Sequence, residues 1–230
     1  GTAARLGVTA GNVSVTDASG TIKTITIDGV GAANASTTNT TVLETLNLSN
    51  VAAGATVTVA DSAAALALNL EKVGTTATAA AVTITTAPAT LNVKSTGANN
   101  VNLTSALTEA LNVSGTGVLN AGTASLGALK SVKVTETAGL TLAAGTAATV
   151  TSIDTTGTTG TVTASINGQT ATYAGGAGVD NVTLTTTAPT KSIATGAGND
   201  KVTLASGTTA MGANGSINAG DGSADTLVIV

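Results

Sequence analysis

The sequence predicts an all-β protein, a parallel β-solenoid (β-helix) whose coils repeat at about 21 residues. From residue 22 onward, a triplet of apolar, polar and apolar residues returns at nearly constant spacing, which is the signature of an internal repeat. The central residues of these triplets are 21, 22, 23, 20, 21 and 21 positions apart. The triplets occupy residues 25–27, 46–48, 68–70, 91–93, 111–113, 132–134 and 153–155.

A second series of triplets falls about half a period after the first, which predicts two strands in each coil. Its members are residues 57–59, 82–84, 101–103, 140–142 and 162–164. In each triplet the outer residues point to one side of the strand and the central residue to the other. We therefore expect the apolar members to face a shared interior, while Asn, Lys and Thr face water.

Pairing of successive coils at about 4.8 Å would give a rod on the order of 50 Å long from roughly ten coils. The main structural alternative is a β-sandwich, which uses short strands at similar spacing. The regular period of the triplets favours the solenoid. The best helical candidate, residues 61–66, is interpreted as a loop or a single turn of helix.

The composition limits which side chains can form the core and which functions are possible. Apolar residues make up 42 % of the chain without any Phe or Trp, and Tyr173 is the only aromatic residue. Small and β-branched side chains suit pleated surfaces packed around a narrow interior. Charged residues make up 9 % and the net charge is -4, so the basic surface that nucleic acids require is missing.

The residue types that are missing exclude several kinds of site. Without cysteine the chain forms no disulfides or thiolate metal sites, and without histidine it lacks the usual zinc ligand and the commonest general base. No apolar run of about 18 residues is present, so we expect no membrane insertion.

Three glycine-aspartate turns near the C-terminus carry the functional signal. They occupy residues 175–180, 196–200 and 220–225, and each precedes a short apolar run. Glycines allow a tight backbone turn, and each aspartate offers a hard carboxylate oxygen of the kind that Ca²⁺ prefers. The turns follow one another at 20 and 24 residues, close to one coil, so they should stack on one edge of the solenoid. Since Ca²⁺ takes 6 to 8 oxygens, two neighbouring turns are needed for each ion.

The predicted calcium ligands fall into three groups. The side chains of Asp180, Asp200 and Asp225 supply carboxylates, and Asn199 and Asp221 are further contributors. Backbone carbonyls come from Gly176, Gly178, Gly196, Gly198, Gly220 and Gly222. The alternative is three ordinary β-turns in which Gly supplies a positive φ and Asp caps its own backbone. The similar offset of the aspartate in all three turns favours calcium.

Residues 175–230, with these turns, resemble the calcium-binding repeat region of RTX-type bacterial surface-layer (S-layer) proteins. The segments Glu-Thr-Leu-Asn-Leu-Ser at 44–49 and Glu-Ala-Leu-Asn-Val-Ser at 109–114 resemble a recurring strand of the same proteins. The resemblance implies β-roll turns that bind Ca²⁺, type I secretion and a place on the extracellular cell surface. It also implies self-assembly with other copies into a planar lattice, anchored to cell-surface glycan or lipopolysaccharide through regions outside this chain.

The sequence departs from the strict repeat of that family at several positions. Thr195 and Ala219 stand where the first glycine belongs, Ala224 is an additional residue, and the turns do not recur every nine residues. We therefore expect two or three separate ions rather than a continuous ladder.

The expected organisation is a β-solenoid repeat region at 1–164 and a calcium-binding β region at 165–230 that continues it. The interval of 29 residues from Asp154 to Thr183 predicts a joint at 165–178. Because the strand pattern runs to both ends, we interpret the chain as a segment of a longer protein.

Two other functions are alternatives to the S-layer hypothesis, an adhesin spacer and an enzyme. The chain could be a calcium-rigidified spacer in a large secreted adhesin, which differs from a lattice protein in staying monomeric. An enzyme that cleaves polysaccharides would need paired carboxylates, and Glu44 and Glu109 lie at similar places before their strands. Three coils would separate them by about 15 Å, too far for acid-base partnership, so we expect no enzyme. Asp17, Asp28 and Asp61 are interpreted as turn residues.

Overall fold

The computed structural model describes residues 4–8, 12–31, 34–60, 62–86, 88–143 and 148–230. All of its regular elements are β-strands, arranged in two parallel sheets of eleven strands each. The first sheet consists of β1 (Ala4–Val8), β3 (Thr24–Val30), β5 (Thr45–Val51), β7 (Ala65–Val73), β9 (Thr90–Thr96), β11 (Ala110–Gly115), β13 (Ser131–Glu136), β15 (Ser152–Thr158), β17 (Thr172–Ala174), β19 (Ser192–Ala194) and β21 (Ser216–Asn218). The second consists of β2 (Val13–Thr16), β4 (Asn34–Thr38), β6 (Thr56–Val59), β8 (Ala80–Ile84), β10 (Asn99–Ser105), β12 (Val118–Ala121), β14 (Gly139–Leu142), β16 (Val162–Ile166), β18 (Asp180–Leu184), β20 (Lys201–Thr203) and β22 (Thr226–Val228).

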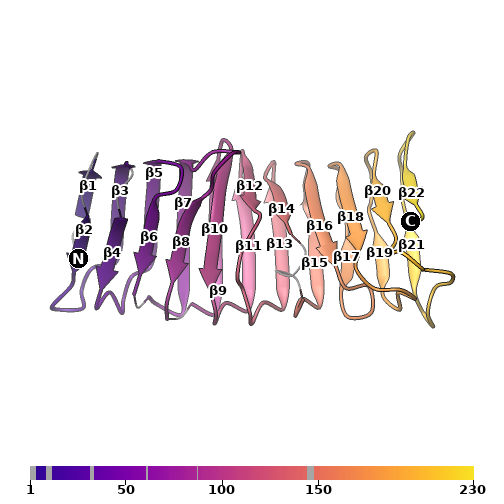
Figure 1. Cartoon of the computed structure of the whole chain (residues 1–230), viewed down its shortest axis with the longest axis horizontal. Helices are drawn as coiled ribbons and strands as arrows, with labels where there is room; N and C mark the ends of the chain where they lie inside the picture. Colours follow the sequence, from indigo (N-terminus) through magenta and orange to yellow (C-terminus); the bar gives the residue numbers. More distant parts are fainter. Residues whose placement is uncertain (1–3, 9–11, 32–33, 61, 87, 144–147) are drawn as a thin grey trace.

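The chain alternates strictly between the two sheets, so each coil contributes one strand to each sheet. Odd-numbered strands pair only with odd-numbered neighbours and even-numbered strands only with even-numbered ones. Figure 1 shows the result, a rod in which the strands lie across the long axis and the two termini lie at opposite ends. This confirms the predicted parallel β-solenoid with coils of about 21 residues.

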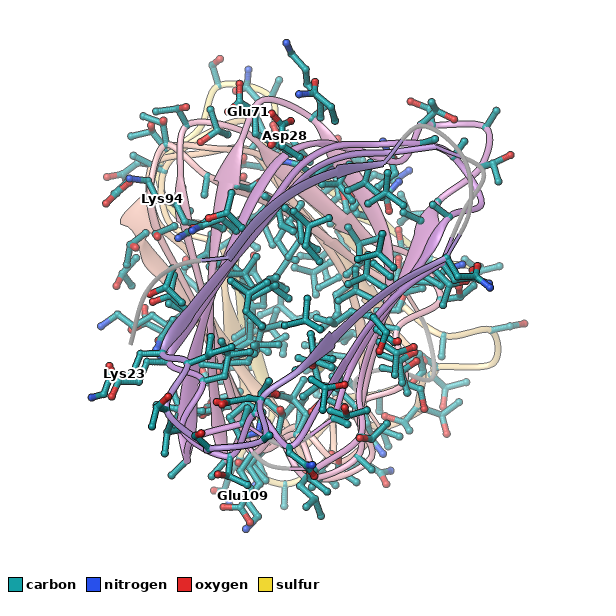
Figure 2. All side chains as sticks on the ribbon, turned by 90° about the vertical axis from the view of Figure 1, so that its left-hand side faces the viewer. Lys23, Asp28, Glu71, Lys94 and Glu109 are labelled. Carbon is teal, nitrogen blue, oxygen red and sulfur yellow. The ribbon has the colours of Figure 1, made fainter. Side chains whose placement is uncertain are left out.

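The core is a narrow, continuous interior between the sheets. In β5, Leu46 and Leu48 are at most 1 % exposed while Asn47 between them points outward. Register aligns Leu46 with Leu68 of the next coil, so like side chains stack along the rod. Viewed along the axis in Figure 2, side chains fill this interior, and the labelled charged residues lie on the periphery. Burial of these stacked aliphatic residues, at about 25 cal/mol for each Å² of apolar surface, is the main stabilising contribution.

The outer faces carry rows of polar side chains that hydrogen-bond from one coil to the next. The amide of Asn47 donates to Thr26 (3.0 Å), that of Asn69 donates to Asn47 (2.7 Å), and that of Asn112 donates to Asn92 (2.8 Å). These ladders arise because strand register places like residues side by side. They give the outer face of the solenoid a polar character.

The structure bears on two expectations about local organisation. The 29-residue interval is not a gap, because β17 lies within it and Asp154 pairs with Ala174, 20 residues further on. Both sheets therefore run through residues 165–178 without a joint, and β16 spans residue 164. Of the segment 61–66, residues 62–64 form a loop as one of the two interpretations expected, and residues 65–66 instead begin strand β7.

Two of the aspartates interpreted as turn residues can be placed, and Asp61 lies outside the described residues. Asp17 is buried in a turn and accepts a hydrogen bond from the Ile22 amide at 2.6 Å, as expected. Asp28 instead lies within β3, where its Oδ1 accepts from Ser49 Oγ and Asn50 Nδ2, both at 2.7 Å. The turn prediction for Asp28 was wrong because its polar neighbours come from the adjacent coil.

Candidate functional site

The three glycine-aspartate turns stack directly on one another at one edge of the solenoid. Their spacing allows this because the strands that follow them, β18, β20 and β22, pair in register. Lys201 aligns with both Asn181 and Thr226, which puts Asp180, Asp200 and Asp225 at one position in three successive coils. We call these three residues the carboxylate column. Adjacent members are separated by one coil, about 4.8 Å along the axis.

Backbone hydrogen bonds fasten each turn to the next. The Ala197 amide donates to the Gly176 carbonyl and the Asp221 amide to the Gly196 carbonyl, both at 2.7 Å. Each of these carbonyl oxygens keeps a second lone pair with which it can accept a cation. These hydrogen bonds therefore leave the Gly176 and Gly196 carbonyls able to bind a cation as well.

The stacked glycines leave no space for side chains between the turns. A Cβ built on Gly198 would lie 2.5 Å from the Gly178 carbonyl oxygen, and one on Gly222 would contact the Gly198 oxygen. On Gly175 a Cβ would meet Asp180 Oδ2. Glycine at these positions lets the carbonyls and the carboxylates of neighbouring coils crowd together at one edge.

Two carboxylates of the column, those of Asp180 and Asp200, are almost inaccessible to solvent, whereas Asp225 is partly exposed. Asp180 is 1 % exposed and Asp200 2 % exposed. The amide of Asp180 donates to Asp200 Oδ1 at 2.8 Å, and the amide of Asp200 donates to Asp225 Oδ1 at 2.9 Å. These bonds satisfy one oxygen of each receiving carboxylate.

The second oxygens of two of these carboxylates have no partner. Among the buried side-chain atoms that the structure describes, only Asp180 Oδ2 and Asp200 Oδ2 lack a hydrogen bond. An unpartnered buried polar atom costs about 1 to 3 kcal/mol, and more when the group is charged. Two neighbouring carboxylates also repel each other, so the pair is a costly feature unless a cation lies between them.

Electrostatics shows the same cost. The pKa of Asp180 is raised to about 7, mainly because the carboxyl group is buried. The hydrogen bond from Tyr173 lowers this pKa, and the nearby charge of Asp200 raises it. The pKa of Tyr173 is also raised, mainly by burial and then by the charge of Asp180, so its hydroxyl stays protonated and acts as a donor. A divalent cation at this place would compensate the negative charge and favour the ionised carboxylate.

Tyr173 is the main site residue that sequence reasoning missed. It lies in β17 of the opposite sheet, is 2 % exposed, and its hydroxyl donates to Asp180 Oδ1 at 2.7 Å. The buried Thr155 hydroxyl lies 3.4 Å from the Tyr173 oxygen. The one available signal was that a single tyrosine occurs in an otherwise aliphatic interior.

The other two predicted side-chain ligands lie on the outside of the turns. Asn199 Oδ1 accepts hydrogen bonds from Ser223 N (3.2 Å), Ser223 Oγ (3.3 Å) and Ala224 N (3.2 Å). Through these hydrogen bonds Asn199 holds the next turn in place. The Asp221 side chain is exposed, while its backbone bridges Gly196 and Gly198.

The donor set fits Ca²⁺ only if backbone atoms complete it. No three acidic side chains converge on one point in the described residues, and the chain has no His or Cys. The ligands predicted for two adjacent turns are two aspartates and four glycine carbonyls, at least six oxygens by count. A mixed set of carboxylates and carbonyls of this size is typical of calcium and unsuited to softer metals.

The two glutamates considered for catalysis are apart and engaged elsewhere. Glu44 forms an ion pair with Lys23 and Glu109 forms one with Lys130, each at 2.6 Å on the exposed surface. They precede β5 and β11, between which β7 and β9 intervene. The three-coil separation predicted from the sequence is therefore confirmed.

A groove of about 300 Å³ lies at the C-terminal end of the solenoid. It is lined mainly by apolar side chains, including Leu204, Met211, Ile217 and Leu227. The groove is where the interior of the solenoid opens, because β21 and β22 are the last strands of their sheets. It holds no charged side chain and lies apart from the chemistry of the carboxylate column.

Fold and site together define a parallel β-solenoid with a column of three carboxylates, two of them buried, between its last coils. Searches against protein families, curated proteins and solved structures found no significant match to the chain. Where the structure describes the chain, no helix is long and apolar enough to cross a membrane.

Proposed function

We propose that this chain is a calcium-stabilised structural segment of a bacterial S-layer protein. The observation that carries the proposal is the carboxylate column, with its two unpartnered buried oxygens on Asp180 and Asp200. The proposed ligands are the column carboxylates and the carbonyls of the stacked glycines. When bound, Ca²⁺ would neutralise the buried charge and hold adjacent coils together.

The burial of the column supports a structural rather than a catalytic role for the ion. With Asp180 and Asp200 at 1 % and 2 % exposure, a substrate has no approach to an ion between them. Protein oxygens from two turns would also supply a full ligand set, whereas catalytic ions keep an open position. We therefore propose that the chain is not an enzyme.

Calcium dependence suits a protein that folds after export. Extracellular calcium modules bind at about 10⁻⁴ to 10⁻³ M, so they load outside the cell but remain empty at cytoplasmic calcium concentrations. Before loading, the repulsion within the carboxylate column would keep the last coils loose and compatible with passage through a secretion channel. Such behaviour would suit type I secretion, which the resemblance to cell-surface proteins implies.

The surface of the solenoid supports assembly with other copies. The outer faces carry polar side chains in successive coils, among them Asn and Thr, and hydrogen bonds such as that from Asn69 to Asn47 link one coil to the next. Repeated donors and acceptors at fixed spacing can pair with an equally regular face of a neighbouring molecule. We propose other copies of the chain as its partners, with attachment to cell-surface glycan or lipopolysaccharide left to regions outside it.

An adhesin spacer is the second candidate, favoured by the rod shape in Figure 1. Electron microscopy of the purified chain in millimolar Ca²⁺ distinguishes the two. We expect planar arrays with calcium and their dissolution in chelator, with Mg²⁺ as the control cation. Rods that remain monomeric in calcium would contradict the lattice and support the spacer.

A further inference from the structure

The carboxylate column ends abruptly on its N-terminal side. Val162 of β16 is in register with Asp180 and is fully buried, so the preceding coil offers an aliphatic side chain in place of a carboxylate. The same position holds Leu140 and Leu119 in the two coils before that. The column therefore begins at Asp180.

Hydrogen bonding at Asp180 differs from that in the rest of the column. The amides of Asp180 and Asp200 each donate to the carboxylate of the next coil. The amide of Val162, at the equivalent position, instead donates to the backbone carbonyl of Val179 at 2.9 Å. Asp180 Oδ1 is thus left for a different donor.

Tyr173 is that donor, and it reaches Asp180 from the opposite sheet. Its register neighbours, Ile153 and Ile193, have no polar atom with which to do the same. The 2.7 Å bond from its hydroxyl occupies Asp180 Oδ1, while Asp180 Oδ2 has no partner among the described residues. The bond fixes the carboxylate with one oxygen satisfied and the other available.

We propose that Tyr173 terminates the calcium column, so that the chain binds two ions and Asp200 is shared by both. The inner ion lies between the turns of Asp180 and Asp200, and the outer ion between those of Asp200 and Asp225. Tyr173 is a positioning residue, since it orients Asp180 toward the inner ion without binding that ion. This inference rests on the proposed calcium function. It adds the number of ions, their positions along the column, and Tyr173 as the residue that orients a ligand.

Calorimetric titration with Ca²⁺ tests the count, and Tb³⁺ luminescence tests the location. Tyr173 is the only aromatic residue, so light absorbed by tyrosine can sensitise Tb³⁺ only from this one position. Because energy transfer falls steeply with distance, the inner ion should give most of the emission. We expect two ions per chain, with most of the sensitised emission from an ion at the inner site.

Aspartate variants separate the two sites. We expect Asp225→Asn to keep one ion and the sensitised emission, Asp180→Asn to lose the emission, and Asp200→Asn to lose both ions. Asp154→Asn is the control, because Asp154 is a partly exposed residue of β15 away from the column, and it should keep both ions. Retention of a tightly bound ion in Asp200→Asn would overturn the shared site.

Tyr173→Phe tests the positioning role by calorimetry. Loss of an orienting hydrogen bond typically weakens a metal site by about 10 to 100-fold. We expect this weakening for one of the two ions, the one that Asp225→Asn retains, with the other unchanged. Two unaltered affinities, or a wild-type count of one or three, would overturn the inference. A wild-type count of zero would instead overturn the proposed calcium function itself.

Discussion

Asp200→Asn is expected to abolish most of the stabilisation that the protein gains from calcium. Wild-type protein with two sites of about 10⁻⁴ M affinity should gain roughly 1.4 kcal/mol from each ion in 1 mM Ca²⁺, or about 3 kcal/mol in total. Asp200 lies between the other two members of the carboxylate column, and the proposal makes it a ligand of both ions. Its replacement by the neutral, isosteric amide therefore removes a ligand from both ions.

Urea unfolding with and without calcium, at constant ionic strength, measures this effect. In chelator the same variant should be at least as stable as wild type, because it removes one of two adjacent buried negative charges. This opposite behaviour separates a metal ligand from a residue that is merely needed for folding. Asp154→Asn should respond to calcium as wild type does. An equal calcium response in Asp200→Asn would count against the calcium role.

Gly196→Ala is the second substitution for which we expect a large effect. Gly196 has a φ of 88°, and a Cβ there would lie 2.7 Å from the Gly175 carbonyl oxygen and nearer still to that of Gly176. A left-handed conformation costs a residue with a side chain about 1 to 2 kcal/mol, and overpacking costs a further 1 to 3 kcal/mol. The total, about 2 to 5 kcal/mol, should appear in the free energy of unfolding in calcium.

Gly207→Ala is the matched control for this substitution. Gly207 has a similar φ of 82° but nothing lies within 4 Å of the Cβ position. Only the backbone cost should apply, about 1 to 2 kcal/mol. Equal losses in the two variants would show that the close stacking of the glycine turns contributes nothing to stability.

The architecture could be predicted from the sequence because one coil repeats one pattern. Triplets such as Leu46, Asn47 and Leu48 alternate between the interior and the surface, and their spacing is the length of a coil. Since parallel register stacks equivalent positions, the same spacing placed Asp180 and Asp200 in adjacent coils. Fold, coil length and stacking of the glycine turns therefore followed from local pattern alone.

Elements that depend on contacts between sheets could not be found in this way. Strand β17 has three residues, Thr172–Ala174, and its only inward side chain is a tyrosine, so it gave no aliphatic triplet. The bond from Tyr173 to Asp180 crosses the interior and depends on packing that no spacing encodes.

The corners of the coil could not be predicted from the sequence for a related reason. Asn50, Lys72 and Glu136 adopt left-handed φ values of 52°, 56° and 66° near the ends of first-sheet strands. Lys and Glu rarely adopt this conformation, so composition gave no sign of it. Coil stacking imposes these bends regardless of the residue type.

Anomalous diffraction from crystals grown in millimolar Ca²⁺ tests the central claim most directly. The account predicts a calcium peak between the carboxylates of Asp180 and Asp200, coordinated by the two oxygens that otherwise have no hydrogen bond. A map with no peak there, and with those oxygens bonded to water or to protein donors, would contradict it.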